Sequence, residues 1–161
     1  IRRKNGPIAD YYLDLYRWYT AHCRRYVVIP ESLSYPIWLA LTEASRLPPA
    51  ENTLSLTLEV PEDRLFIMDY DKWGYRVNHW YIPADPEDER RYNEGLRRCG
   101  IDNEALLIMT DRGNYYPIIR QKIIRSWDRI FAGPSPDPDA NVGTIWEIKM
   151  DWVKEVEIYD P

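Results

Sequence analysis

The chain has 161 residues, the length of one domain with its own hydrophobic core, and its formal net charge of −5 gives no overall attraction to nucleic acid or to an anionic membrane surface. Its two cysteines, Cys23 and Cys99, have no CxxC spacing, which excludes a disulfide framework and indicates free thiols in a reducing compartment. No apolar run reaches the ~20 residues of a membrane span, and the charged start of the chain lacks the apolar segment of a signal peptide. We therefore expect a cytoplasmic protein without a membrane anchor.

The aromatic residues are mostly amphipathic, because 13 Tyr and 7 Trp stand against only 2 Phe. Tyr and Trp combine a large apolar ring with a polar tip, so they suit clefts and interfaces as well as cores. A helix predicted over residues 10–26 carries many of them on one face, which contains Tyr11, Tyr12, Leu15, Trp18, Tyr19, His22 and Tyr26.

Strands are predicted after this helix. Short apolar runs at 27–29 and 36–41 have the length and the boundaries of strands. Residues 54–60 alternate between apolar and polar side chains, which is the period of a strand with two different faces. A further apolar run follows at 65–68.

From residue 69 onward the sequence predicts three helices and three strands. Asp69 or Asp71 can cap one helix, and Asp85 followed by Pro86 begins another that stops at Cys99-Gly100. The remaining predicted elements are a strand at 105–109, a helix at 117–131, a proline-rich loop at 133–139 and strands at 144–150 and 155–159.

These elements mix helices and strands without a regular βαβ repeat. The sequence therefore predicts an α+β fold: a single domain over residues 1–161, with a split or mostly antiparallel sheet and flanking helices.

Three polar residues stand among apolar neighbours and are candidates for a site. His22 lies on the aromatic face of the first helix, either as a core histidine or as a ligand-binding group. Arg120 lies near the Trp127 side of its helix, where a guanidinium needs a carboxylate. Glu147, between Trp146 and Ile148, is one partner that would satisfy it.

Other kinds of site find little support. Lys122, Arg125 and Arg129 share one side of a predicted helix, but in an acidic chain such a stripe is usually a solvated face, so nucleic-acid binding is not expected. The chain has two histidines and no metal-ligand spacing, and it has no Walker loop, GxGxxG or GxSxG motif. We expect no metal site.

A set of short motifs spans nearly the whole chain and resembles the uncharacterised bacterial domain of unknown function 3841 family. Its most specific pieces are Ser126-Trp-Asp-Arg-Ile-Phe131 and Thr144-Ile-Trp-Glu-Ile148, and the others are Tyr16-Arg-Trp18, Tyr35-Pro-Ile-Trp38, Leu58-Glu-Val-Pro61, Asp69-Tyr-Asp-Lys-Trp73 and Asn78-His-Trp-Tyr81. Members of that family usually begin with a Trp-containing strand before the region that matches Ile8. The resemblance thus implies that an N-terminal strand is lacking here.

The layout of that family is similar to ADP-ribosyltransferase folds, which use NAD. This similarity implies that Glu147 is the acid that stabilises an oxocarbenium-like transition state. It also implies that Tyr35 and Trp38 are cleft aromatics beside nicotinamide and that residues 134–139 form a loop facing the substrate. A likeness of layout does not by itself establish an activity.

Two functions therefore remain open from the sequence. One is an NAD-dependent ADP-ribosyltransferase-like enzyme with Glu147 as catalytic acid and with Tyr35, Trp38, His22 and Arg120 around the bound substrate or cofactor. The alternative is a non-catalytic interaction module whose Tyr/Trp-lined cleft binds a peptide or a partner protein. The enzyme requires Glu147 on the floor of a pocket, whereas the module pairs it with a base and exposes its aromatic residues on an open surface.

Overall fold

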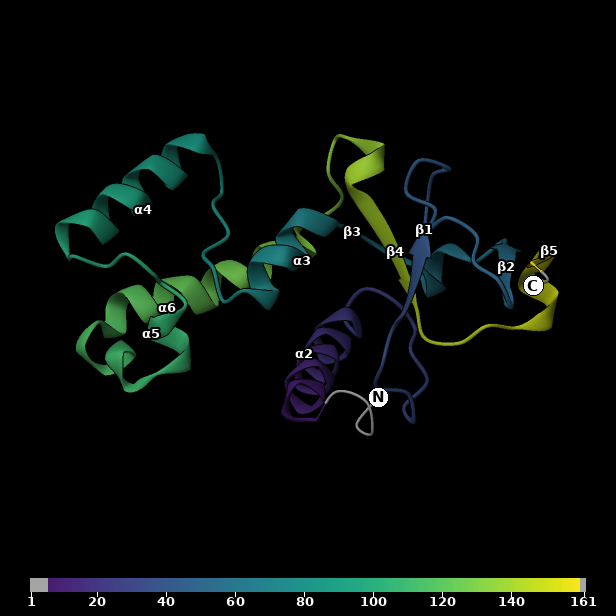
Figure 1. Cartoon of the computed structure of the whole chain (residues 1–161), viewed down its shortest axis with the longest axis horizontal. Helices are drawn as coiled ribbons and strands as arrows, with labels where there is room; N and C mark the ends of the chain where they lie inside the picture. The colour runs from purple at the N-terminus through teal and green to yellow at the C-terminus, as the bar shows by residue number, and fades with distance from the viewer. Residues whose placement is uncertain (1–5, 160–161) are drawn as a thin grey trace. The chain divides into compact units, whose positions relative to one another are not determined.

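The computed structural model describes residues 6–159, so the charged start of the chain lies outside the described residues. The chain forms two compact units, both drawn in Figure 1. Unit 1 comprises Ile1–Ile67 with Ser135–Pro161, and unit 2 comprises Met68–Pro134. Unit 1 contains the first helix and the two sheets apart from the last residues of β3 (Phe66–Asp69), whereas the other α-helices belong to unit 2.

A three-stranded sheet in the order β1-β4-β3 organises unit 1. Its strands are β1 (Ile37–Ala40), β4 (Asn141–Ile145) and β3 (Phe66–Asp69), and β3 leads into unit 2. β1 and β4 are antiparallel, with Trp38 opposite Thr144. Two segments far apart in the sequence thus place these residues on the same face of the sheet.

Helix α2 (Pro7–Cys23) packs against that face. Proline at its first position suits a helix start, because this position has no intrahelical partner for an N–H. Tyr19, which is 0% exposed, donates to or accepts from the Thr144 hydroxyl at 2.8 Å, and its ring lies 6.2 Å from that of Phe66. Tyr19 is therefore the point at which the helix is fastened to the sheet.

The second sheet of unit 1 is the antiparallel pair β2 (Thr53–Leu58) and β5 (Val153–Tyr159). Arg46 joins its polar face, where the guanidinium bonds to Ser55, Glu157 and Tyr159. The apolar face carries Leu54, Leu56, Val156 and Ile158, of which all but Leu56 are exposed.

Unit 2 contains helices α3 (Tyr70–Val77), α4 (Pro86–Arg98), α5 (Leu106–Met109) and α6 (Pro117–Ser126). Asp69 caps α3 by accepting from the Asp71 N–H at 3.0 Å, and Asp85 caps α4 by accepting from the N–H groups of Glu87 and Asp88. The core of the unit is apolar and aromatic and includes Trp73, Tyr92, Leu107, Ile123, Trp127 and Ile130.

Short 3-10 helices complete the secondary structure at Glu62–Arg64, Asp111–Tyr115, Trp127–Ala132, Pro138–Ala140 and Met150–Trp152. Among residues 6–159, no helix combines the length and the apolar character needed to cross a bilayer. The structure confirms the predicted α+β class, with helices and two small sheets.

Two of the predicted strands are wrong. Residues 105–109 form a helical turn, because the N–H groups of Ile108 and Met109 both reach the Ala105 carbonyl at 3.0 Å. Residues 27–29 are irregular, and the Val28 N–H bonds to the Asp63 carbonyl rather than to a strand. Short apolar runs fit either kind of element, and here a local helical turn at 105–109 and a long-range backbone hydrogen bond of Val28 replace the expected strand pairing.

Two further predictions were too long. The predicted helix at 117–131 ends as an α-helix at Ser126 and continues as a 3-10 turn. The predicted strand at 144–150 ends at Ile145, which pairs with Ile37. Pro36, which precedes Ile37 in β1, has no N–H with which to extend the β1–β4 pairing.

Candidate functional site

The five candidate residues are divided between the two units. His22, Tyr35, Trp38 and Glu147 belong to unit 1, whereas Arg120 belongs to unit 2. Each unit is therefore considered on its own.

Glu147 follows the end of β4 and is engaged by two bases. Its Oε1 lies 3.1 Å from NH1 of Arg64 and 3.5 Å from Nζ of Lys149, and its side chain is 29% exposed. Arg64 comes from the 3-10 turn before β3. The base that pairs with Glu147 is therefore Arg64 and not the predicted Arg120.

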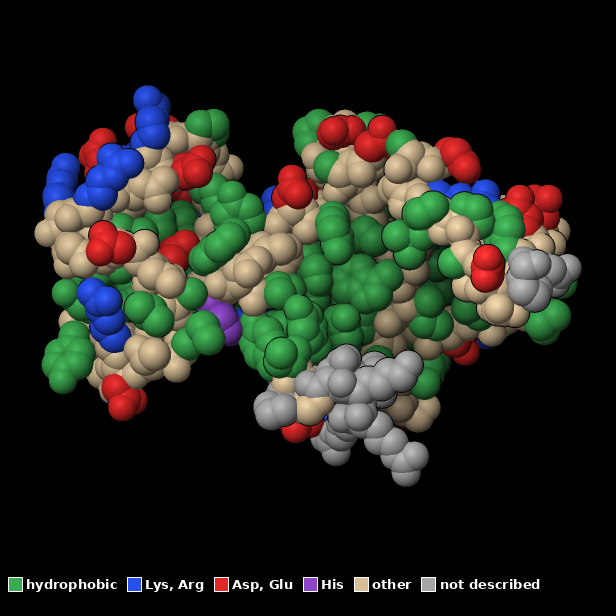
Figure 2. Space-filling model, viewed as in Figure 1, with side chains coloured by type: hydrophobic (Ala, Val, Ile, Leu, Met, Phe, Trp, Pro, Cys, Tyr) green, Lys and Arg blue, Asp and Glu red, His purple; other side chains and the backbone are tan. Residues whose placement is uncertain are grey.

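A row of four aromatic rings runs from α2 to β1. Successive ring centroids lie 5.6 Å apart for Tyr11 and Tyr12, 6.3 Å for Tyr12 and Tyr16, and 6.2 Å for Tyr16 and Trp38. Tyr12 is 36% exposed and the other three rings are half-buried. Figure 2 shows hydrophobic side chains gathered over α2. We call Tyr11, Tyr12, Tyr16 and Trp38 the aromatic row.

The inner end of the aromatic row is fixed by the core. The Tyr19 ring stacks on Trp38 at 5.9 Å and on Trp146 at 6.1 Å, with interplanar angles of 17° and 18°. The Trp146 indole N–H donates to the Thr20 hydroxyl at 2.8 Å. The Tyr19 and Trp146 rings are buried and hydrogen-bonded, so the Trp38 ring that stacks on Tyr19 has little freedom to move.

The other two unit 1 candidates have partners of their own. Tyr35 is exposed, and its hydroxyl accepts from Arg17 at 3.0 Å. His22 packs on Trp18 with ring centroids 4.6 Å apart, and its Nδ1 lies 2.8 Å from the Trp18 carbonyl oxygen. A carbonyl can only accept, so Nδ1 carries the proton.

Arg120 is exposed and lines a pocket of about 400 Å³ with Asn114 and Arg125. Its aliphatic stem lies over Gly113, where an added Cβ would come within 2.7 Å of the Arg120 Cδ. Arg120 is therefore exposed and not enclosed by apolar neighbours as the sequence predicted, so burial does not require a carboxylate partner for its guanidinium.

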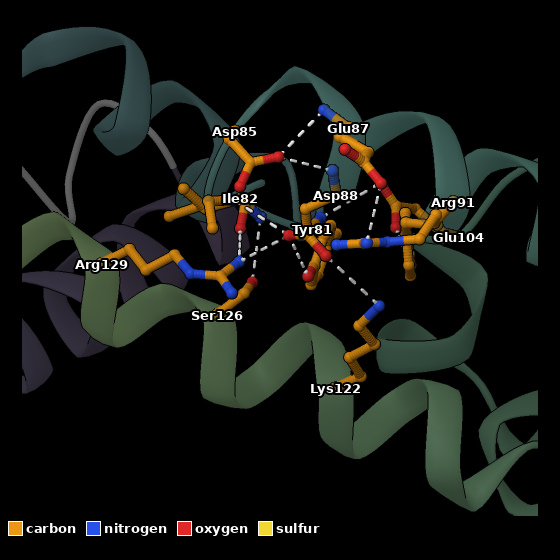
Figure 3. A network of polar contacts seen from close by, with 12 residues as sticks. Tyr81, Ile82, Asp85, Glu87, Asp88, Arg91, Glu104, Lys122, Ser126 and Arg129 are labelled. Atoms are coloured by element: carbon orange, nitrogen blue, oxygen red, sulfur yellow. Dashed lines mark hydrogen bonds and ion pairs between the residues drawn. The ribbon is translucent and has the colours of Figure 1, made fainter.

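Unit 2 contains a polar network, shown in Figure 3, that no sequence motif predicted. The Asp88 carboxylate accepts from the Tyr81 hydroxyl at 2.6 Å and from the Ala84 N–H at 2.9 Å. Arg129 and Lys122 lie 3.4 and 3.7 Å from its two oxygens. These hydrogen bonds, and then the two bases, hold the pKa of Asp88 below its usual value. Two members of the predicted basic stripe therefore have a structural partner.

A half-buried acid, Glu104, lies next to this network. Glu104 accepts from the Tyr81 N–H at 3.1 Å and from the Tyr92 hydroxyl. Its burial raises the pKa of the carboxyl group. The rings of Tyr81 and Tyr92 stack at 3.9 Å, so the two acids and the two tyrosines form one interlocked cluster. An alternation or a cap motif cannot reveal such a cluster, because its members come from separate elements.

Among the described residues, no group of three His, Cys, Asp or Glu side chains is placed to hold a metal ion. The free thiols are Cys23, which is buried, and Cys99, which is exposed.

Comparison with known proteins gives one match. The family model described as "Domain of unknown function (DUF3841)" matches residues 1–154. No curated protein and no solved structure matches the chain.

Proposed function

Since the chain belongs to the DUF3841 family, whose description assigns no activity, we propose from its geometry that it is a non-catalytic interaction module. In this proposal the aromatic row of unit 1 binds an extended, apolar peptide segment of a partner protein. The observation that carries the proposal is the continuous series of ring contacts that ends on the buried Tyr19 stack.

Aromatic rings of this kind suit peptide recognition for two reasons. Tyr and Trp are enriched in the central parts of protein interfaces, where they contribute large contact areas with few rotatable bonds. The Tyr19 stack holds Trp38 before any partner arrives, so little side-chain entropy is lost on binding. Extended segments with proline or aliphatic side chains dock on such rows of rings in known recognition modes.

The surroundings of Glu147 also support the interaction module. A carboxylate that stabilises a developing positive charge has to face that charge. Here Arg64 and Lys149 already neutralise Glu147, which is the pairing expected of an acid with a structural role. The proposal further assigns the module to the reducing cytoplasm, in keeping with its free thiols.

The NAD-dependent transferase is tested by titrating NAD into the wild-type protein and into a Glu147→Gln variant. We expect no saturable heat with either protein, and a small loss of stability in the variant from the weakened ion pairs. Saturable NAD binding and slow NAD hydrolysis that disappear in Glu147→Gln would favour the enzyme instead.

The interaction module is tested by selecting peptides from a displayed random library on the wild-type protein. We expect the enriched peptides to share apolar or proline positions and to bind a Tyr12→Ala/Tyr16→Ala variant at least about tenfold more weakly, which corresponds to about 1.4 kcal/mol. Tyr115→Ala is the matched control, because Tyr115 is 82% exposed and lies in unit 2. If no peptide is enriched, or if both variants bind the enriched peptides as the wild type does, the proposal is wrong.

A further inference from the structure

Unit 2 contains a cavity of about 290 Å³ that is separate from the aromatic row. Its walls include three aromatic rings, Tyr75, Trp80 and Tyr92, and three carboxylates, Glu89, Asp102 and Glu104. We propose that this cavity binds a small organic cation through an alkylammonium group. The proposal does not depend on the function assigned to unit 1.

Two of the rings form an accessible aromatic corner. Tyr75 lies in α3 and Trp80 follows that helix, and their rings meet at 83° with centroids 5.9 Å apart. Trp80 is 43% exposed, so its ring is open to a ligand. A cation placed in this corner would contact the negatively polarised face of a Trp, the aromatic residue that binds cations best.

The charge of the cavity has one sign. No Lys or Arg is among its lining residues, whereas Glu89, Asp102 and Glu104 all are. Glu89 and Asp102 form no ion pair with any residue of the described chain, so their charges are available to a ligand. The pKa of the Tyr75 hydroxyl is raised, first by its burial and then by nearby acids that include Glu89 and Glu104. A negative potential of this kind attracts cations and repels phosphates and carboxylates.

Unit 2 already contains a similar contact made by one of its own side chains. The Lys122 ammonium lies 4.9 Å from the Tyr81 ring centroid and 5.1 Å from that of Tyr92, and it is 3.7 Å from Asp88. An ammonium group thus sits between aromatic faces and a carboxylate within this unit. Among the described residues, no Lys or Arg side chain lies over the rings of Tyr75 and Trp80, and the cavity offers the same two kinds of surface, aromatic faces and carboxylates, to a ligand.

The size of the cavity indicates a small ligand. Its volume is at the lower end of the range for small-molecule pockets. An alkylammonium of that size is either a free amine such as choline or the side chain of a methylated lysine in a peptide. Both sources share the same head group, so both are used as ligands in the test.

The test follows two-dimensional amide and indole NMR spectra of the whole protein during titration with choline and, separately, with Nα-acetyl-trimethyllysine amide. We expect saturable shifts of the Trp80 indole and of the amides of Asp102 and Glu104 with at least one of them. The ligand that saturates at the lower concentration identifies the source. The neutral isostere 3,3-dimethylbutan-1-ol has the same shape without the charge and is expected to cause no saturable shift.

Two variants separate binding from folding. Trp80→Ala and Asp102→Asn are each expected to weaken binding by about tenfold, the size of a partly desolvated cation–π or charge contact. Tyr115→Ala, an exposed residue of unit 2 outside the cavity, is expected to bind as the wild type does. The inference is overturned if neither cation gives saturable shifts, if the neutral isostere binds equally well, or if correctly folded Trp80→Ala retains full affinity.

Discussion

Tyr19→Phe removes one buried hydroxyl from the centre of unit 1 and leaves its ring in place. Tyr19 is fully buried, and its hydroxyl shares a hydrogen bond of 2.8 Å with Thr144. The Thr144 hydroxyl also lies 3.2 Å from the Phe66 carbonyl, to which it can donate. Without the Tyr19 hydroxyl, the buried Thr144 oxygen loses a partner, and this loss costs about 1–3 kcal/mol.

This cost is measured as the change in the free energy of unfolding by urea, followed by tryptophan fluorescence, since Trp38 and Trp146 flank the Tyr19 ring. Tyr115→Phe makes the same chemical change on an exposed side chain and should alter the free energy by less than about 0.5 kcal/mol. If Tyr19→Phe and Tyr115→Phe have the same free energy of unfolding, the Tyr19 hydroxyl does not stabilise the packing of α2 on the sheet.

Three further predictions concern local chemistry. The pKa of Asp88 is lowered in the folded protein, so its ionised carboxylate stabilises the fold above about pH 4, the pKa of Asp in the unfolded chain. This stabilisation is lost as the pH falls through the folded-state pKa. Between these two pKa values, the free energy of unfolding of Asp88→Asn should therefore fall less on acidification than that of the wild type. Gly113→Ala should lower the free energy of unfolding by urea by about 1–3 kcal/mol, because the new Cβ would lie 2.0 Å from the Leu107 carbonyl oxygen. An unchanged urea midpoint would contradict this close approach of Gly113 to Leu107. Burial raises the pKa of Cys23 to about 12, so a thiol reagent at neutral pH should titrate only the exposed Cys99 until the protein is denatured; two reactive thiols in the native protein would contradict this.

Local signals in the sequence predicted several elements well. Asp85 followed by Pro86 marks the start of α4, and the structure has both the cap and the proline in the expected places. The alternation at residues 54–60 predicts a strand there, and β2 covers Thr53–Leu58. These signals depend on neighbours in the chain, so one sequence suffices to interpret them.

Features that depend on distant partners could not be predicted in this way. Glu147 pairs with Arg64, which is 83 residues away, because β3 and β4 belong to one sheet. The last two strands belong to different sheets, because β4 pairs with β1 and β5 pairs with β2, and the strand periods do not indicate these partners. The Asp88 cluster likewise depends on how α4 and α6 pack, which no periodicity reveals.

We propose that the aromatic row, and not Glu147, carries the function of unit 1. The most direct test of this proposal is an isothermal titration of one selected peptide into three proteins: the wild type, Tyr12→Ala/Tyr16→Ala and Glu147→Gln. We predict equal dissociation constants for the wild type and Glu147→Gln, and at least about tenfold weaker binding by the double variant. Loss of binding in Glu147→Gln, with the double variant unaffected, would contradict the claim.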